Sequence, residues 1–255
     1  MISGLMPPRR AVACTFMALP MGAAAALAQP VATSGMSAEI TTDLRERGLG
    51  WSGGKPALVV DGTLALSPEL SLDARAMTLR GSARHGGSDA GFDIGPRASI
   101  AVEDWDLSAR VRGRFFTGQG TLDYVEAGLS AARTVGPAWV AVGVDFAPSQ
   151  AAIGGDNLYL WSNASLGLPG TPVTLEAGGG YTMGENSSTA AARLRPRGNH
   201  ANYHVGLEAN RRNLSLGVRF SGTFGGKEAA LPALPDQPGP EHSGERIAAY
   251  ARVSL

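Results

Sequence analysis

Segments in which polar and apolar side chains alternate at every second position constrain the fold of this chain more than any other feature. The segment 104–116, DWDLSARVRGRFF, places Arg110, Arg112 and Arg114 (hereafter the arginine row) at every second position. Successive residues of a β-strand point to opposite faces, so the arginines would share one face and the apolar residues between them the other. A helix would spread the arginines over roughly 200° of its surface. The segment therefore predicts a strand with one polar and one apolar face.

The same two-residue period recurs along the rest of the chain and predicts about twelve strands of roughly ten residues each. About ten residues is the length a strand needs to cross a bilayer at a tilt. No run after Gln29 approaches the ~20 apolar residues that a membrane-spanning helix needs. The further segments are 36–45, 56–66, 70–79, 91–102, 121–132, 137–147, 157–168, 173–182, 200–209, 214–224 and 245–255.

Residues 1–28 have the features of a signal peptide for secretion. Arg9 and Arg10 supply a positive start, an apolar stretch follows, and Ala26-Leu27-Ala28 is a small-residue cleavage site before Gln29. An uncleaved helical anchor is the alternative. The only cysteine of the chain, Cys14, lies within this segment. The mature chain would therefore have no disulfide, no thiol nucleophile and no thiolate metal site.

The connections between the strands alternate in length, which is typical of a bacterial outer-membrane barrel. The sequence therefore predicts an all-β fold, a transmembrane antiparallel up-and-down β-barrel of about 12 strands, over residues 29–255. A soluble barrel or sandwich would show the same alternation along each strand, but it has no reason to keep this rhythm of connections. Short turns fall at 67–69, 103–105, 134–137, 169–172 and 210–213, and generally longer links at 46–55, 80–89, 148–156, 184–198 and 225–244, while 117–120 is short.

In such a barrel both termini and the short turns would face the periplasm, and the longer loops the outside. The last segment supports barrel closure, because its apolar face continues to the final residue, Leu255. Outer-membrane barrels end in such a strand, usually with an aromatic residue, which the barrel-assembly machinery reads. We therefore expect that machinery, the lipid bilayer and lipopolysaccharide as partners; the sequence does not indicate an oligomeric state. The loops expected outside lie around Lys55, His85, Ser187 and Pro235.

Charge and histidine placement argue against several other functions. The formal net charge is zero, so no overall basic field would attract nucleic acid. His85 and His242 fall in predicted loops, and His200 and His204 lie about 13 Å apart on one strand face, too far to bind one metal ion. We therefore predict no enzyme activity, no catalytic residues, no metal and no cofactor. A hydrolase that modifies outer-membrane lipids is the weaker alternative.

The segment 41–62, TTDLRERGLGWSGGKPALVVDG, resembles the pattern S-D-Y-R-F-R-G-x-S-x-S-x-x-x-P-A-x-x-G of the TorF family of porins from Gram-negative bacteria. Leu44 and Glu46 replace the two aromatic residues of the pattern, and Gly50 replaces its first serine. The resemblance implies an outer-membrane location and a porin function, with no assigned substrate. The residues that fit the pattern are Thr42, Asp43, Arg45, Arg47, Gly48, Ser52, Pro56 and Ala57.

The sequence thus predicts a porin that lets small solutes or ions diffuse across the outer membrane; a non-conducting structural or adhesive barrel is the alternative. An inward-folded loop would close the lumen, and the proline-rich segment 230–244 is a candidate. For the arginine row we expect Asp93 and Glu126 as partners, with at least one arginine left facing water as a ladder for anions. The residues expected to line the lumen are Asp61, Asp73, Arg75, Asp93, Arg97, Arg110, Arg112, Arg114, Glu126, Asp145, Glu176, Glu208, Arg219 and Arg252.

Overall fold

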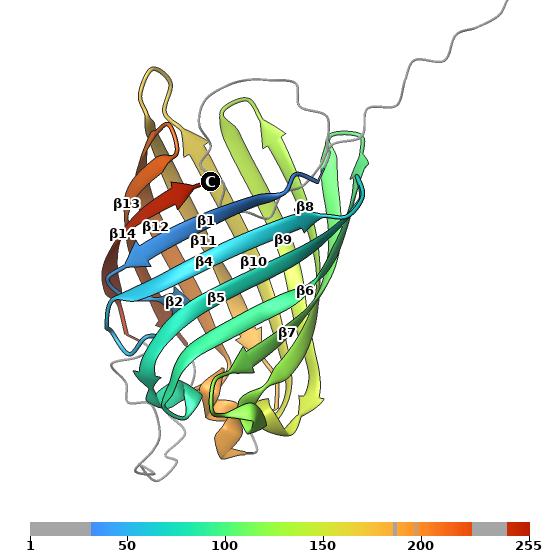
Figure 1. The fold of residues 1–255 in the computed structure, drawn as a ribbon, viewed down its shortest axis with the longest axis vertical. Coiled ribbons are helices and arrows are strands. Elements are labelled where there is room, and N and C mark those ends of the chain that lie inside the picture. Colours follow the sequence, from blue (N-terminus) through green and yellow to red (C-terminus); the bar gives the residue numbers. More distant parts are fainter. Residues whose placement is uncertain (1–31, 186–187, 197, 226–243) are drawn as a thin grey trace, which may run out of the picture.

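The computed structural model describes residues 32–185, 188–196, 198–225 and 244–255, and within them twelve strands form one closed antiparallel barrel (Figure 1). Each strand pairs with its neighbours along the sequence, and the last pairs with the first to close the ring. The prediction of an up-and-down barrel is confirmed. Its strands are β1 (Gly35–Thr41), β4 (Ala57–Ala65), β5 (Leu70–Ser82), β6 (Ser88–Val102), β7 (Trp105–Phe116), β8 (Tyr124–Val135), β9 (Ala138–Gln150), β10 (Gly155–Gly167), β11 (Val173–Met183), β12 (His200–Arg211), β13 (Leu214–Phe224) and β14 (Arg246–Ser254).

The remaining elements are short and belong to the loops. Two strands of two residues, β2 (Arg45–Glu46) and β3 (Leu49–Gly50), pair as a small hairpin. Among the described residues, no helix is long and apolar enough to span a membrane. The predicted signal peptide, residues 1–28, lies outside the described residues. The described parts of the loops also contain four 3-10 helices: η1 (Ala83–His85), η2 (Gly120–Leu122), η3 (Ala151–Ile153) and η4 (Thr189–Arg193).

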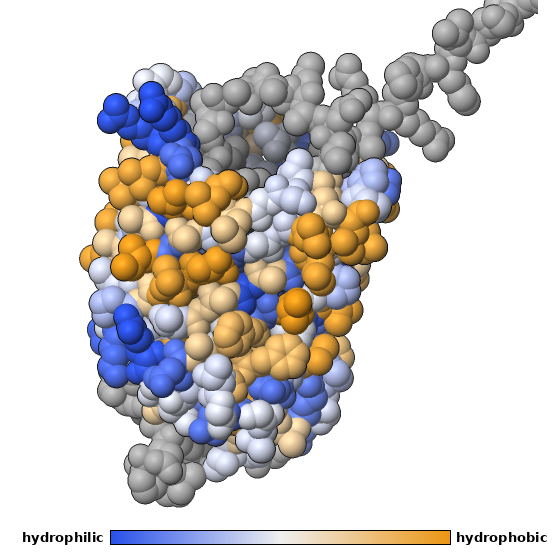
Figure 2. Space-filling model, viewed as in Figure 1, coloured by the Kyte–Doolittle hydropathy of each residue, from blue (hydrophilic) through white to orange (hydrophobic). Residues whose placement is uncertain are grey.

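The two-residue alternation separates an apolar outer face from a polar inner face. In β7, Leu107 and Val111 are exposed on the outside, while the arginine row points inward. The register places large apolar residues of neighbouring strands side by side, as in Leu129 opposite Val144. They merge into a belt that crosses the middle of the molecule, with polar surface toward both ends (Figure 2). A soluble protein would bury such a belt, whereas hydrocarbon would cover it favourably.

The two ends of the barrel differ as the sequence predicts. The connections 66–69, 103–104, 136–137, 168–172 and 212–213 are tight turns at one end, here called the turn end. The connections 42–56, 83–87, 117–123 and 151–154 lie at the other end, here called the loop end, as do the described parts of 184–199 and 225–245. The link expected at 117–120 is longer than predicted, because η2 extends it to residue 123. Most of the proline-rich candidate plug, 230–243, lies outside the described residues.

We predict that an arginine on the outer face of β9 damages folding far more than one on the inner face of β10. Val142 is 52% exposed on the outer face, and Val142→Arg would place a charge in the hydrocarbon, at a cost of roughly 2–4 kcal/mol near the midplane. Ser165 lies on the inner face of β10, so Ser165→Arg is the matched control. Refolding titrations into lipid vesicles measure both costs; equal losses would contradict this assignment of the faces.

Candidate functional site

The barrel interior is crossed by the connection between β1 and β4, residues 42–56, here called the inner hairpin. Its two short strands are joined by a two-residue turn, in which Arg47 and Gly48 have φ values of 51° and 75°. Two positive φ values in succession are typical of the type I′ turn that joins tight hairpins. Glycine suits the second position because it has no Cβ. The turn places Glu46 and Arg47 at the tip of the inner hairpin.

The residues of the family-like pattern build the base of the inner hairpin. The hydroxyl of Ser52 lies 3.4 Å from an Asp43 carboxylate oxygen and donates to the Lys55 carbonyl at 2.6 Å. It also accepts the backbone N–H of Leu44 at 3.0 Å. Arg45 donates to the carbonyl of Gly48 at 2.5 Å and lies 3.3 Å from Asp43. These bonds hold the loop folded back on itself without a long strand to support it.

Gly48 fits between the tip and the wall of the barrel. A Cβ added there would lie 2.6 Å from the Thr223 methyl carbon, 2.7 Å from the Asn202 Cβ and 2.8 Å from the Gly222 carbonyl oxygen. These residues belong to β12 and β13. Glycine is therefore required at this position for two reasons: the positive φ and the close approach of the wall.

The two charges of the tip bind the opposite wall. Arg47 donates to both carboxylate oxygens of Glu126 at 2.9 and 3.0 Å and lies 3.6 Å from Asp145. Its guanidinium also lies 4.6 Å from the ring centre of Tyr159. The Glu46 carboxylate takes two parallel hydrogen bonds from Arg114, one of them at 2.9 Å. Charge-assisted pairs of this kind are among the stronger hydrogen bonds, so they fix the tip against β7, β8 and β9.

Every member of the arginine row has a carboxylate partner. Arg110 donates to both oxygens of Asp145 at 2.7 and 2.9 Å, and Arg112 pairs with Glu126. Arg114 is fully buried and pairs with Glu46, with Asp93 at 3.7 Å and with Glu126 at 3.4 Å. The expectation that at least one of these arginines lacks a partner is wrong. The expected partners Asp93 and Glu126 are present, and Asp145 and Glu46 join them.

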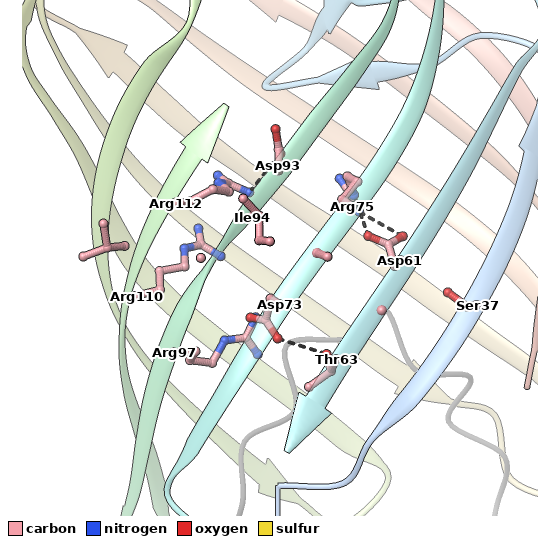
Figure 3. Close-up of a pocket in the computed structure, with 14 residues that line it drawn as sticks. Ser37, Asp61, Thr63, Asp73, Arg75, Asp93, Ile94, Arg97, Arg110 and Arg112 are labelled. Carbon is pink, nitrogen blue, oxygen red and sulfur yellow. Dashed lines mark hydrogen bonds and ion pairs between the residues drawn. The ribbon is translucent and has the colours of Figure 1, made fainter. Parts of the chain in front are cut away.

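Toward the turn end, paired charges line a cavity of about 240 Å³. Asp61 accepts from Arg75 at 2.6 Å, and Asp73 lies 2.5 Å from Arg97. Thr63 donates to Asp73 at 2.9 Å. Figure 3 shows these side chains on β4, β5 and β6, with Asp93, Arg110 and Arg112 beside them. The cavity therefore borders the wall that holds the tip of the inner hairpin.

A second group of charges lies on the wall formed by β11 to β14 and β1. Arg252 pairs with Glu39 at 2.8 Å and with Glu208 at 3.3 Å, and Glu208 also accepts from the Tyr250 hydroxyl at 2.9 Å. Arg219 pairs with Glu176 at 3.1 Å. A cavity of about 200 Å³ separates much of this wall from the inner hairpin. Polar space thus lies beside the hairpin and, toward the turn end, beside the wall that holds its tip.

At the loop end, arginines and apolar side chains form a layer across the barrel mouth, here called the loop layer. Arg84 donates to the carbonyls of Gly50 and Arg193, and Arg193 donates in turn to the Arg84 carbonyl. Arg193 also donates to the carbonyls of Leu122 at 2.9 Å and Ala152 at 2.6 Å. One guanidinium therefore connects η1, η2 and η3 to η4. The apolar residues packed together here include Trp51, Leu79, Phe116, Tyr124, Ile153 and Leu194.

The loop layer should loosen in acid because of His85. This residue is fully buried between Trp51 and Phe116, at ring-centre distances of 4.4 and 4.7 Å. Burial lowers the pKa of His85 well below its ordinary value, and Arg193 and Arg84 act in the same direction. The neutral form is thus favoured in the folded layer. The contribution of neutral His85 to the stability of the layer is therefore complete above the unfolded pKa of about 6.5. As the pH decreases below that value, this contribution is lost at no more than about 1.4 kcal/mol per pH unit.

Limited proteolysis of the loops at pH 7.5 and at pH 5 would measure this effect, with faster cleavage expected at pH 5. His85→Phe is the control, because a benzyl ring can keep the stack and cannot titrate. The same acid sensitivity in wild type and His85→Phe would show that another group is responsible.

Among the described residues, no group of three or more His, Cys, Asp or Glu side chains is arranged to bind a metal ion. Sequence reasoning missed Glu46 and Glu39 as interior acids, and it missed Arg84 and Arg193 in the loop layer. Glu46 and Arg47 lie in the segment 41–62, which resembles a family pattern, and that resemblance was the available signal for the inner hairpin. For the two loop arginines no sequence signal was available.

A model of the family described as "Bacterial protein of unknown function (Gcw_chp)" matches residues 24–246. The chain belongs to the Gcw_chp family. The match includes the inner hairpin and most of the barrel of this Gcw_chp member, and it leaves the TorF name a prediction. No curated protein matches the chain.

Several solved structures share the fold of this Gcw_chp protein at very low sequence identity. The NanC porin has a TM-score of 0.58 at 4% identity, over 87% of this chain and 98% of that chain. The KdgM porin has a TM-score of 0.54 at 8% identity, over 86% and 99%. An outer membrane channel from Pseudomonas putida F1 has a TM-score of 0.51 at 12% identity, over 89% and 96%. These similarities establish a shared barrel fold.

Proposed function

We propose that this protein is an outer-membrane channel through which small polar solutes or ions diffuse passively. The observation that carries the proposal is the contrast between an apolar outer belt and an interior with two polar cavities lined by charged side chains. A barrel in lipid satisfies all its backbone groups between strands and leaves its interior to water and solutes. The fold shared with the NanC and KdgM porins supports this function.

The inner hairpin would set the size of solute that passes. Its tip binds the wall at β7 to β9, and it divides the polar space inside the barrel into separate cavities of about 240 and 200 Å³. The arginine row and its partners balance in charge, because Arg47, Arg110, Arg112 and Arg114 face Glu46, Asp93, Glu126 and Asp145. We therefore infer weak selectivity between anions and cations.

The same proposal includes the location and partners expected from the sequence. Residues 1–28 would direct secretion and be removed, and the barrel would lie in the outer membrane among lipids and lipopolysaccharide. Closure through β14 and β1 agrees with assembly from the C-terminal strand. The absence of enzyme activity and membership of the TorF porins belong to this proposal as well.

Planar-bilayer recordings of the refolded chain test the proposal. We expect stepwise single-channel conductance, and a reversal potential near zero in a potassium chloride gradient because the interior charges balance. A strongly anion-selective current would contradict the inferred charge balance and would favour the arginine ladder for anions that the sequence predicts. An absence of current through correctly folded barrels would overturn the channel function and favour a closed structural barrel.

A further inference from the structure

The tip of the inner hairpin resembles a bound ligand. Glu46 and Arg47 are neighbours in the sequence and carry opposite charges, yet they do not pair with each other in the structure. Glu46 instead pairs with Arg114, and Arg47 with Glu126 and Asp145. The Arg47 side chain is only 8% exposed and that of Glu46 20% exposed. The wall therefore receives a carboxylate and a guanidinium at two adjacent positions.

Each half of this wall has the chemistry that recognises one sign of charge. Arg114 presents two N–H groups in a fixed fork, which suits a carboxylate. Glu126 and Asp145 present two carboxylates beside the face of Tyr159, which suits a guanidinium or an ammonium group. These residues lie on β7, β8, β9 and β10, which are consecutive in the barrel. The wall supplies all the groups of the site, and the hairpin supplies the two side chains that occupy it.

Charge balance decides which solute such a wall would accept. Without the tip, Arg110, Arg112 and Arg114 face Asp93, Glu126 and Asp145, which is three charges of each sign. The tip adds one charge of each sign and preserves this balance. A simple anion or cation in its place would leave one buried charge without compensation, which is costly at a site where Arg114 and Glu126 are 0% and 2% exposed. A molecule with both charges has no such cost.

We propose that this wall is a binding site for a small zwitterionic solute, and that Glu46 and Arg47 occupy it when the channel is at rest. The inference rests on the proposed channel function, since it names the class of solute that would displace the hairpin. The solute is an amino-acid- or dipeptide-sized molecule with a carboxylate and an amino or guanidino group. The cavity of about 240 Å³ shares Arg112 and Asp93 with this wall and lies next to it toward the turn end (Figure 3).

The test uses N-acetyl-glutamyl-arginine amide, which carries the two charges of the tip and has no charged ends. Its matched controls are the peptides in which glutamine replaces the glutamate or the arginine, so that each carries a single charge. Calorimetry of the full chain in detergent measures binding whether or not the barrel conducts. We expect at least tenfold tighter binding of the doubly charged peptide than of either control in the double variant Glu46→Gln with Arg47→Gln, which vacates the wall.

Two further variants keep the test decisive. Gly48→Ala displaces the tip without altering any charge, so it should bind the doubly charged peptide more tightly than wild type does. It replaces the double variant in the test if the double variant does not fold. Glu126→Gln added to either variant should abolish the preference. Equal binding of all three peptides, or none to a folded variant with a vacated wall, would overturn the zwitterion site and leave the channel function standing. Binding without conductance in bilayers would overturn the channel function alone.

Discussion

Replacing Gly48 by alanine should raise the conductance of the proposed channel. The added methyl group would meet the Thr223 side chain, the Asn202 Cβ and the Gly222 carbonyl at 2.6 to 2.8 Å, distances that Cβ atoms do not tolerate. All three obstacles belong to the barrel wall, and the backbone fixes the Asn202 Cβ and the Gly222 carbonyl, so the tip of the inner hairpin must move. Arg47 and Glu46 would then lose their places on the wall. We expect a severalfold rise in single-channel conductance in planar bilayers.

Gly54→Ala is the matched control for this prediction. Gly54 has φ of 71°, close to the 75° of Gly48, but a Cβ at Gly54 would meet no atom within 4 Å. Both substitutions carry the strain of a left-handed alanine, about 1–2 kcal/mol. Only Gly48→Ala adds the clash with the wall. Equal conductance of the two variants would mean that the inner hairpin does not limit the current.

The barrel was predictable because the two faces of each strand carry side chains of different polarity. One face is apolar and lies outside and the other is polar and lies inside, so the two-residue period persists through Leu107 and Arg110 as through Ile247 and Arg252. The rhythm of turns and loops then gives the order and direction of the strands. The inner hairpin shows no such period in the sequence, because β2 and β3 have only two residues each. Its partners lie on strands distant in the sequence.

The partners of the arginine row show where the sequence is insufficient. Adjacent strands are about 4.8 Å apart, so the neighbouring strands β6 and β8 were the natural source of acids. Arg112 does face Glu126 in register, but Arg110 faces Gly128 and pairs with Asp145 on the strand beyond. The absence of a side chain at Gly128 leaves room for this ion pair, because a Cβ on Gly128 would lie 2.2 Å from an Asp145 oxygen. Register and side-chain size together decide this pairing, and only the structure supplies the register.

Replacing Arg114 by methionine should be the most destabilising single change in the interior. Arg114 is fully buried, contacts Glu46, Asp93 and Glu126, and lies 5.0 Å from the ring centre of Trp51. Methionine fills similar space but leaves buried carboxylates without their cation. Loss of one partner from a buried ion pair costs about 3–5 kcal/mol, because the remaining charge stays desolvated. Urea unfolding of the barrel in lipid vesicles would measure the loss in the free energy of unfolding.

Arg133→Met is the matched control, because Arg133 also pairs with an acid, Asp104, at 2.7 Å, but the two side chains are 37% and 73% exposed. Water solvates both partners there, so the loss should be under about 1 kcal/mol. Adding Glu46→Gln to Arg114→Met should recover part of the stability, because glutamine keeps the shape of the tip and removes a charge that has lost its partner. Similar losses for Arg114→Met and Arg133→Met, with no recovery from Glu46→Gln, would show that this ion pair does not hold the inner hairpin against the wall.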